Sequence, residues 1–214
     1  MTEQGKGKLY LASDQFALAH SAGLSQQARM ETTEPAAARY SRGAIVLHWT
    51  IALLIIGNVA GAWLAEGMPK PDRAPIMGLH KAFGITILLL SLVQIGWRLT
   101  HKPPPLVATL KVWEAALAKV THWLFYILIL VLPLSGWAFV SSAGAGKPVS
   151  IFGLFNLPAL PVGADKPTIG TFKEMHEVLG YLMVALLLLH VVGALKHHFL
   201  DRDATLRRML TWRT

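Results

Sequence analysis

Four histidines lie within long apolar stretches of the sequence, where a polar ring has few hydrogen-bonding partners. They are His48, His80, His176 and His190. His176 and His190 are fourteen residues apart, close to four helical turns, so in one helix both rings would project from the same face. An imidazole in hydrocarbon is costly unless it is hydrogen bonded or bound to a metal ion. The spacing therefore indicates two metal-binding positions stacked along one helix.

The elements that must position these rings are transmembrane helices. Of the 214 residues, 53% are hydrophobic and only 15% are charged, which is typical of a membrane protein. We predict an all-α, up-and-down bundle of four membrane-spanning helices, over residues 44–65, 76–97, 120–140 and 174–196. The chain has no cysteine, which excludes disulfides, thiolate metal ligands and iron–sulfur clusters held by this chain.

Depth in these helices sorts the histidines into two pairs. His48 and His190 each lie about one turn inside the same membrane surface, whereas His80 and His176 begin their helices at the opposite surface. Along the fourth helix the two depths are separated by about 21 Å. A single membrane histidine more often forms a hydrogen bond between helices, and that alternative remains for each residue alone. Matching depths favour metal binding.

Small residues follow the paired histidines by one helical turn, on the same helix face. They are Ala52, Gly84, Gly180 and Ala194. A flat cofactor laid against a helix needs such an open surface, although small residues are also common where helices cross. His122 is followed at the same spacing by Tyr126 and has no evident partner at equal depth. We therefore expect His122 to be an interfacial or hydrogen-bonding residue beside Trp123.

Haem fits two separated pairs of imidazoles better than other metal centres do. A zinc site would gather three or four ligands at one point. Two imidazoles on opposite sides of a flat apolar space suit a haem iron whose full coordination favours electron transfer over oxygen binding. Met77, Met175 and Met183 are alternative axial ligands, or fill the core and the interface as apolar side chains.

Several sequence motifs surround these histidines. They are Arg39-Tyr-Ser-Arg with Leu47-His48-Trp49, Pro71-Asp-Arg-Ala-Pro75, Thr121-His-Trp123 with Leu132-Pro-Leu-Ser-Gly136, and Lys173-Glu-Met-His-Glu177 through Leu189-His190 to Lys196-His-His198. From Arg39 to Arg208 the sequence resembles the bacterial cytochrome b561 family, which is related to the membrane cytochrome b subunits of nickel–iron hydrogenases. The resemblance implies two b-type haems. It makes His48 and His190 ligands of a cytoplasmic-side haem, and His80 and His176 ligands of an external-side haem.

Basic residues near the helix ends predict the orientation. Eleven lie on the side of the chain termini, namely Arg39, Arg42, Arg98, Lys102, Lys111, Lys119, Lys196, Arg202, Arg207, Arg208 and Arg213. Six lie on the other side, namely Lys70, Arg73, Lys81, Lys147, Lys166 and Lys173. The excess predicts a protein of the bacterial inner membrane with both termini in the cytoplasm. The net charge of +8 thus reflects topology and lipid headgroups rather than nucleic-acid binding.

The resemblance implies electron transfer between an external donor and the quinone pool, and some family members are superoxide oxidases that pass electrons to ubiquinone. Five external cations would give the external mouth a positive field that concentrates superoxide, or else contact lipid phosphates. They are Arg73, Lys81, Lys147, Lys166 and Lys173. For quinone the candidates are His197, Arg42 and Trp49. His197 lies seven residues beyond His190, where an imidazole suits proton transfer to a quinone, but it also fits a role as an interfacial anchor.

Two other functions compete with this reading. One is a haem-bearing membrane anchor that relays electrons for a partner redox enzyme and catalyses nothing itself. A haem-free transporter or metal channel using the same histidines is disfavoured, because cation transport is expected to need intramembrane carboxylates. The predicted spans hold no Asp or Glu in their cores, and Glu174 and Glu177 lie only at an end.

The remaining segments carry weaker signals. We expect residues 1–38 to be an extension that is disordered or forms a weak surface helix, and translation from Met30 would leave only METTEPAAARYSR before the first span. Residues 39–208 form the cytochrome domain and 209–214 a cytoplasmic tail. Pro69, Pro71 and Pro75 are expected to break the first external loop. Residues 141–171 are too long for a simple connection, and we expect an external cap on the bilayer interface.

Overall fold

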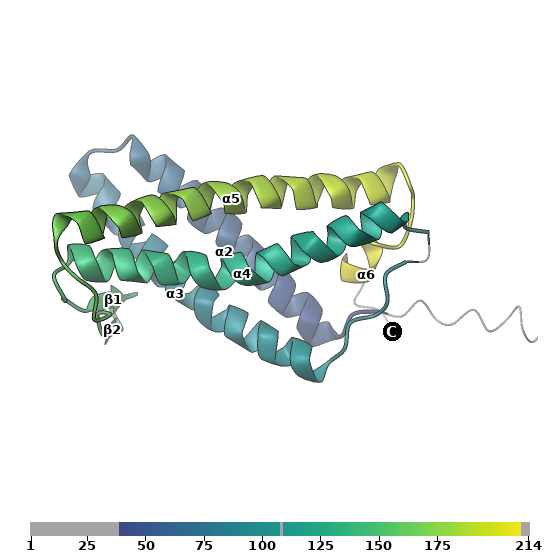
Figure 1. The fold of residues 1–214 in the computed structure, drawn as a ribbon, viewed down its shortest axis with the longest axis horizontal. Helices are drawn as coiled ribbons and strands as arrows, with labels where there is room; N and C mark the ends of the chain where they lie inside the picture. The colour runs from purple at the N-terminus through teal and green to yellow at the C-terminus, as the bar shows by residue number, and fades with distance from the viewer. Residues whose placement is uncertain (1–38, 108, 211–214) are drawn as a thin grey trace, which may run out of the picture. The chain divides into compact units, whose positions relative to one another are not determined.

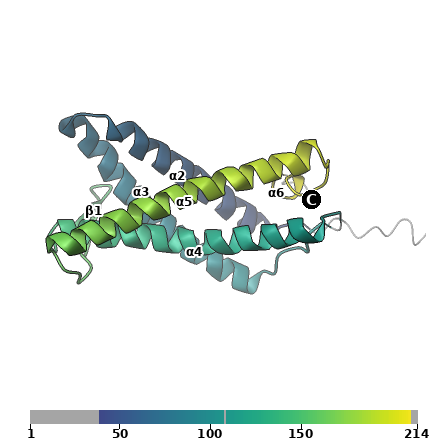
Figure 2. The ribbon, with the colours of Figure 1, turned by 45° about the horizontal axis from the view of Figure 1, so that its top comes forward.

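The fold, seen in a computed structural model, is built on four long helices, and residues 39–107 and 109–210 are described. The helices are α2 (Arg42–Glu66), α3 (Lys70–Thr100), α4 (Val112–Ala143) and α5 (Lys166–Phe199). Each is long and apolar enough to cross a membrane, which confirms the predicted four-helix membrane bundle. Successive helices pack on one another, α2 on α3, α3 on α4 and α4 on α5 (Figures 1 and 2). The predicted N-terminal extension and the alternative start lie outside the described residues.

The two ends of the bundle are named here by what they carry. The tail end is where α2 and α4 begin and α3 and α5 end, together with residues 200–210. The hairpin end is the opposite one, with the strands β1 (Val149–Ile151) and β2 (Phe155–Leu157). Figure 1 shows the strands and the short helix α6 (Arg207–Leu210) at these opposite ends.

A close contact joins the start of α2 to the end of α3. The hydroxyl of Ser41 caps α2 by accepting a hydrogen bond from the Ala44 backbone N–H at 3.3 Å. The same oxygen accepts a hydrogen bond from the Trp97 indole N–H at 2.9 Å. A Cβ atom placed on Gly43 would lie 2.5 Å from the Trp97 ring. Glycine at this position therefore permits the two helices to meet.

The helix α3 starts earlier than the sequence predicted. Pro71 lies in its first turn, where backbone N–H groups have no helical partner, so proline costs little there. Pro75 lies inside the helix and removes one hydrogen bond without ending it. The expectation that the prolines break an external loop is therefore wrong for Pro71 and Pro75, whereas Pro69 precedes the helix as its N-cap. As a result, Arg73 belongs to the same helix as His80.

The segment predicted as a cap, residues 141–171, includes the end of α4 and the start of α5, and a small hairpin lies between the two helices. After α4 ends at Ala143, β1 and β2 pair antiparallel in the register Val149 with Leu157. The turn between them holds Phe152 and Gly153 at φ values of 52° and 72°. Val149 and Ile151 are buried in a cluster with Ala82 and Ile85 of α3. The predicted cap is thus an ordered hairpin on α3, and its place at the bilayer interface stays a prediction.

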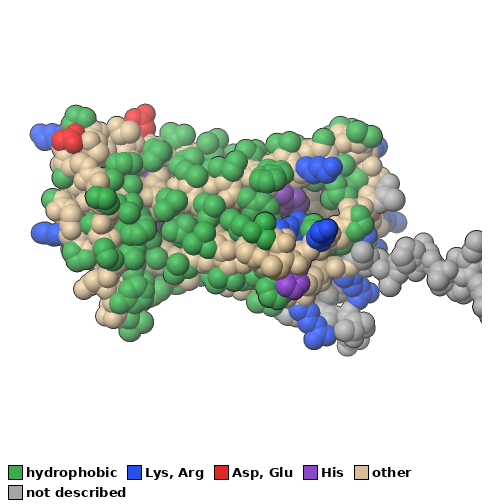
Figure 3. Space-filling view, turned by 60° about the horizontal axis from the view of Figure 1, so that its bottom comes forward, with side chains coloured by type: hydrophobic (Ala, Val, Ile, Leu, Met, Phe, Trp, Pro, Cys, Tyr) green, Lys and Arg blue, Asp and Glu red, His purple; other side chains and the backbone are tan. Residues whose placement is uncertain are grey.

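Apolar side chains both fill the centre of the bundle and cover its outside. The central cluster comprises Ile51, Ile55, Ile87, Leu128, Ile129, Met183 and Leu186. Outward-facing residues such as Leu53 and Leu188 are 65% and 61% exposed. Figure 3 shows hydrophobic side chains over the middle of one face, with Lys and Arg side chains toward its two ends. This distribution matches a surface that faces lipid between two layers of headgroups.

The C-terminal segment folds back onto the tail end. The Trp49 indole N–H of α2 donates to the Met209 carbonyl at 2.8 Å, and a guanidinium N–H of Arg208 donates to the Pro105 carbonyl at 2.7 Å. The tail expected from residue 209 therefore starts within α6, in contact with α2. Residues 211–214 lie outside the described residues.

Two glycines of α2 provide a test of the contact between α2 and α3. Gly43→Ala should lower the thermal midpoint, because the added methyl group meets the Trp97 ring, and overpacking costs about 1–3 kcal/mol. Gly57→Ala meets nothing within 4 Å and should leave the midpoint unchanged or raise it. Thermal unfolding of both variants in detergent, followed by circular dichroism, checks this. Equal midpoints would contradict the contact.

Candidate functional site

The structure places the four histidines as two pairs on facing helices. His48 of α2 lies beside His190 of α5, with 6.2 Å between ring centroids, and this is the tail-end pair. His80 of α3 lies beside His176 of α5 at 6.1 Å, and this is the hairpin-end pair. Helix α5 contributes one residue to each pair. The two pairs that the packed helices form are therefore the same two pairs that the depths of the histidines predict.

The ring separations fit one metal ion between the two rings of each pair. Transition-metal ions bind an imidazole nitrogen at about 2 Å, and the ring centre lies roughly 1 Å behind that nitrogen. Two rings on opposite sides of one ion therefore have centres about 6 Å apart. Both pairs match this separation. Each pair would hold one haem iron between its two rings, which supports the cofactor expected from the sequence.

Hydrogen bonds orient both rings of the hairpin-end pair. The Nδ1 atom of His80 lies 3.2 Å from the Asn58 carbonyl oxygen. The Nδ1 atom of His176 lies 3.1 Å from the Leu132 carbonyl oxygen and 3.0 Å from the Ser135 hydroxyl. When Nδ1 carries the proton, each ring donates to a carbonyl and keeps Nε2 for the metal. This is the usual arrangement of metal-binding histidines.

The position of His176 also depends on Gly136 of α4. A Cβ atom on Gly136 would lie 2.8 Å from the Cε1 atom of His176, so a larger residue would displace the ring. Sequence reasoning quoted the segment that contains Ser135 and Gly136 only as a family motif and missed its role. The sole signal available was a serine and a glycine in adjacent positions of a membrane helix.

A largely apolar cavity of about 510 Å³ surrounds the hairpin-end pair. His80, His176, Gly84 and Gly180 all line it. A Cβ atom on either glycine would meet nothing within 4 Å, so the space in front of both is open. A flat cofactor needs such open surfaces next to its ligands, and the cavity supplies them. Two of the methionines considered as ligands, Met77 and Met183, line the cavity as well.

Charged side chains line the same cavity. They are Glu66, Arg73, Lys81, Lys173 and Glu177. Lys173 forms an ion pair with Glu177 at 2.8 Å, which offsets its charge. Of the five external cations considered in the sequence for superoxide, the cavity therefore brings Arg73, Lys81 and Lys173 close to His80 and His176. Lys147 and Lys166 lie at the same end but are not among the described residues that line it.

His122 is placed differently from the prediction. Its ring centroid lies 5.6 Å from that of His190, so it belongs to the same layer as the tail-end pair. The expectation that His122 has no partner at equal depth is wrong. The rotation of α4 about its axis, which sequence depth does not determine, turns this ring toward α5.

The quinone candidates lie at the tail end and are held by different contacts. The Nδ1 atom of His197 lies 2.9 Å from carboxylate oxygens of both Asp201 and Asp203. The Trp49 indole N–H donates a hydrogen bond to the Met209 carbonyl, and the Arg42 side chain is exposed. Burial raises the pKa of Asp203, but the hydrogen bonds from Thr205 and the neighbouring His197 together lower it by more. The pKa of Asp203 therefore lies below its ordinary value.

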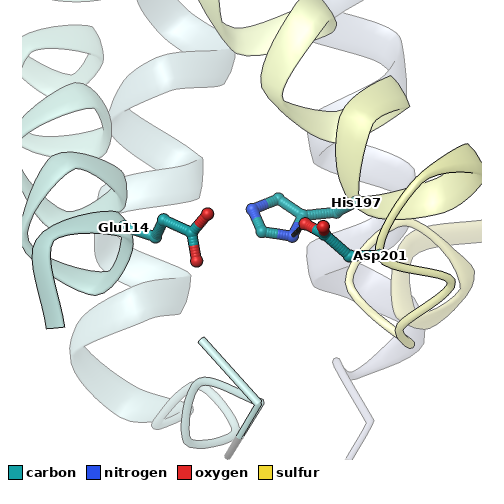
Figure 4. A group of neighbouring side chains, drawn as sticks. All are labelled: Glu114, His197 and Asp201. Carbon is teal, nitrogen blue, oxygen red and sulfur yellow. Dashed lines mark ion pairs between the residues drawn. The ribbon is translucent and has the colours of Figure 1, made fainter. Parts of the chain in front are cut away.

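Glu114, His197 and Asp201 lie together at this end, with ligand atoms within 4.8 Å of one another (Figure 4). The ammonium group of Lys196 lies 2.6 Å from both Glu114 and Asp201. A lysine therefore already supplies the positive charge between these carboxylates. We interpret the group as an ion-pair network that joins α4 to the end of α5, rather than as a metal site.

Comparison with known proteins identifies related sequences. A sequence model described as prokaryotic cytochrome b561 matches residues 39–212. Cytochrome b561 homolog 2 of Escherichia coli (strain K12) is 32% identical over 179 residues, covering 80% of this chain and 91% of that protein. Probable superoxide oxidase CybB of Yersinia pestis is 31% identical over 172 residues, covering 80% and 96%. Cytochrome b561 homolog 1 of Escherichia coli (strain K12) is 28% identical over 177 residues, covering 80% and 97%.

The contact between Gly136 and His176 predicts a selective defect. Gly136→Ala should displace the His176 ring and weaken or abolish cofactor binding by the hairpin-end pair, while the tail-end pair keeps its cofactor. Gly170→Ala, which meets nothing within 4 Å on the same helix as His176, is the matched control and should retain both. Haem content per chain and optical spectra distinguish these results. Full retention in Gly136→Ala would show that the glycine does not position the ligand.

Proposed function

Because the chain belongs to the prokaryotic cytochrome b561 family, we propose that it carries electrons across a membrane between a donor at the hairpin end and quinone at the tail end. The family implies b-type haem. The observation that carries the proposal is the presence of two histidine pairs, one toward each end of the bundle, each spaced for one iron. A bound haem at each pair would take up and release one electron at a time.

Each pair has a defined task in this proposal. His48 and His190 hold the haem of the tail end, and His80 and His176 hold that of the hairpin end. Along α5 the two ligands are separated by about 21 Å. Two haems at these depths shorten the distance over which electrons must cross the apolar interior. The carbonyls of Asn58 and Leu132 keep the hairpin-end rings oriented.

Charge supports an orientation with the tail end in the cytoplasm of a bacterial inner membrane. Among the described residues, ten basic side chains belong to the tail end and six to the hairpin end, and the positive-inside rule places the more basic side in the cytoplasm. Donor oxidation would then take place outside and quinone reduction inside. His197, held between Asp201 and Asp203 at the tail end, is our candidate to supply a proton to the quinone.

We further propose superoxide as the donor and ubiquinone as the acceptor. One relative, from Yersinia pestis, is named a probable superoxide oxidase. Two superoxide anions would each lose one electron to give two dioxygen molecules, and one quinone would take up those two electrons and two protons to give quinol. Lys81 follows His80 directly and lines the cavity without an ion-pair partner among the described residues. Its charge favours the approach of a small anion.

Rapid mixing of the purified, oxidised protein with superoxide tests the reaction. We expect haem reduction in a second-order step, slower at high salt because exposed charges are screened over about 10 Å at 0.1 M. Added ubiquinone should then reoxidise the haems. Haems that superoxide does not reduce, but that a quinol or a partner protein does, would reject the oxidase and favour a relay subunit of another enzyme.

Lys81 provides the matched mutational test. Lys81→Gln should lower the second-order rate roughly 2- to 5-fold and weaken its salt dependence, because one cation beside the entrance is lost. Lys119→Gln, at an exposed position on the tail end, should change neither. Haem content should be equal in both variants. An unchanged rate in Lys81→Gln would show that this lysine does not guide the donor.

A further inference from the structure

Arg73 stands out among the charged residues of the hairpin-end cavity because it is aligned with a histidine of the pair. It lies seven residues before His80 on α3, close to two helical turns, so both side chains project from the same face. Both line the cavity, as does Met77 between them. The rise of the helix places Arg73 about 10 Å from His80, toward the end of the bundle.

The guanidinium of Arg73 is also available to bind an anion. In the part of the chain that the structure describes, it has neither a hydrogen-bond nor an ion-pair partner. Lys173, by contrast, is paired with Glu177. Glu66 lines the cavity too, but no ion pair joins it to Arg73 among the described residues. A planar guanidinium at the entrance of a cavity is suited to bind a carboxylate through two parallel hydrogen bonds.

We propose that Arg73 binds a propionate of the haem held by His80 and His176. The inference rests on the proposed function, because it needs a haem in this cavity. The helical rise of about 10 Å between Arg73 and His80 lies within the combined reach of an arginine side chain and a haem propionate. The propionate edge of the haem therefore faces the hairpin end, and its apolar edge faces the central core of Ile55, Leu128 and Met183.

This assignment gives the two cations next to the cavity different tasks. Arg73 fixes and orients the cofactor, whereas Lys81, one residue after His80, keeps its charge available for an incoming anion. Arg73 is a binding residue for the haem and takes no part in the electron transfer itself. Replacing Arg73 should therefore change how firmly the protein retains haem, even in the absence of any substrate.

Haem transfer from the purified protein to excess apomyoglobin tests the proposal. Two phases are expected from a protein with two haems. Arg73→Gln should accelerate one phase about tenfold, since the charge-assisted hydrogen bond is lost, and leave the other unchanged. Arg73→Lys, which keeps the charge without the planar fork, should give an intermediate rate. Lys166→Gln, at the same end but outside the cavity, is the control and should match the parent protein.

Reconstitution with haem dimethyl ester, which has no free propionate, separates propionate binding from a merely structural role. With this cofactor, Arg73→Gln and the parent protein should release haem at the same rate. The midpoint potential of one haem should fall in Arg73→Gln with ordinary haem, since a nearby positive charge favours the reduced form. Equal release rates with ordinary haem, or an equal acceleration with both cofactors, would overturn the proposal.

The result is independent of the donor. If superoxide fails to reduce the haems while Arg73→Gln still shows the propionate-dependent effect, the donor assignment is wrong and the cofactor assignment stands. If the parent protein from haem-sufficient cells binds no haem, both proposals are wrong.

Discussion

The separation between two imidazole rings, about 6 Å from centre to centre, is the constraint on which the rest of the structure depends. It must be met twice, at two depths, by side chains that come from different helices. Helix α5 serves as the common wall, because His176 and His190 lie on one of its faces. Helices α2 and α3 supply one partner each. The contacts that fix these helices, such as Trp97 against Gly43 and His176 against Gly136, therefore determine the geometry of the pairs.

Room for a cofactor works against the packing of the bundle. The cavity at the hairpin end is open in front of Gly84 and Gly180, so these two positions of α3 and α5 contribute no close side-chain contact. The apolar cluster between the two pairs, with Ile51, Leu128 and Met183, provides packing at the middle depth instead. At the hairpin end, Val149 and Ile151 add contacts to α3. At the tail end, Lys196 of α5 forms ion pairs with Glu114 of α4 and with Asp201, which follows α5.

The sequence predicts the four helices and the depths of the histidines well, because apolar length and helical rise follow directly from residue order. The sequence does not predict features that depend on how each helix is rotated about its axis relative to its neighbours. His122 turns toward His190 only because of the rotation of α4. Ser135 and Gly136 matter only because α4 approaches α5 closely at that point. The start of α3 was misjudged because proline inside a helix costs one hydrogen bond, a loss that the remaining turns of a long helix tolerate.

Haem content and spectra of variants that lack one histidine test the pairing most directly. The protein from haem-sufficient cells should hold two six-coordinate, low-spin b-type haems per chain. His48→Ala and His190→Ala should each remove the same haem, and His80→Ala and His176→Ala should each remove the other, because one iron needs both imidazoles of its pair. His122→Ala should keep both. The account would be contradicted if His48→Ala and His80→Ala removed one and the same haem.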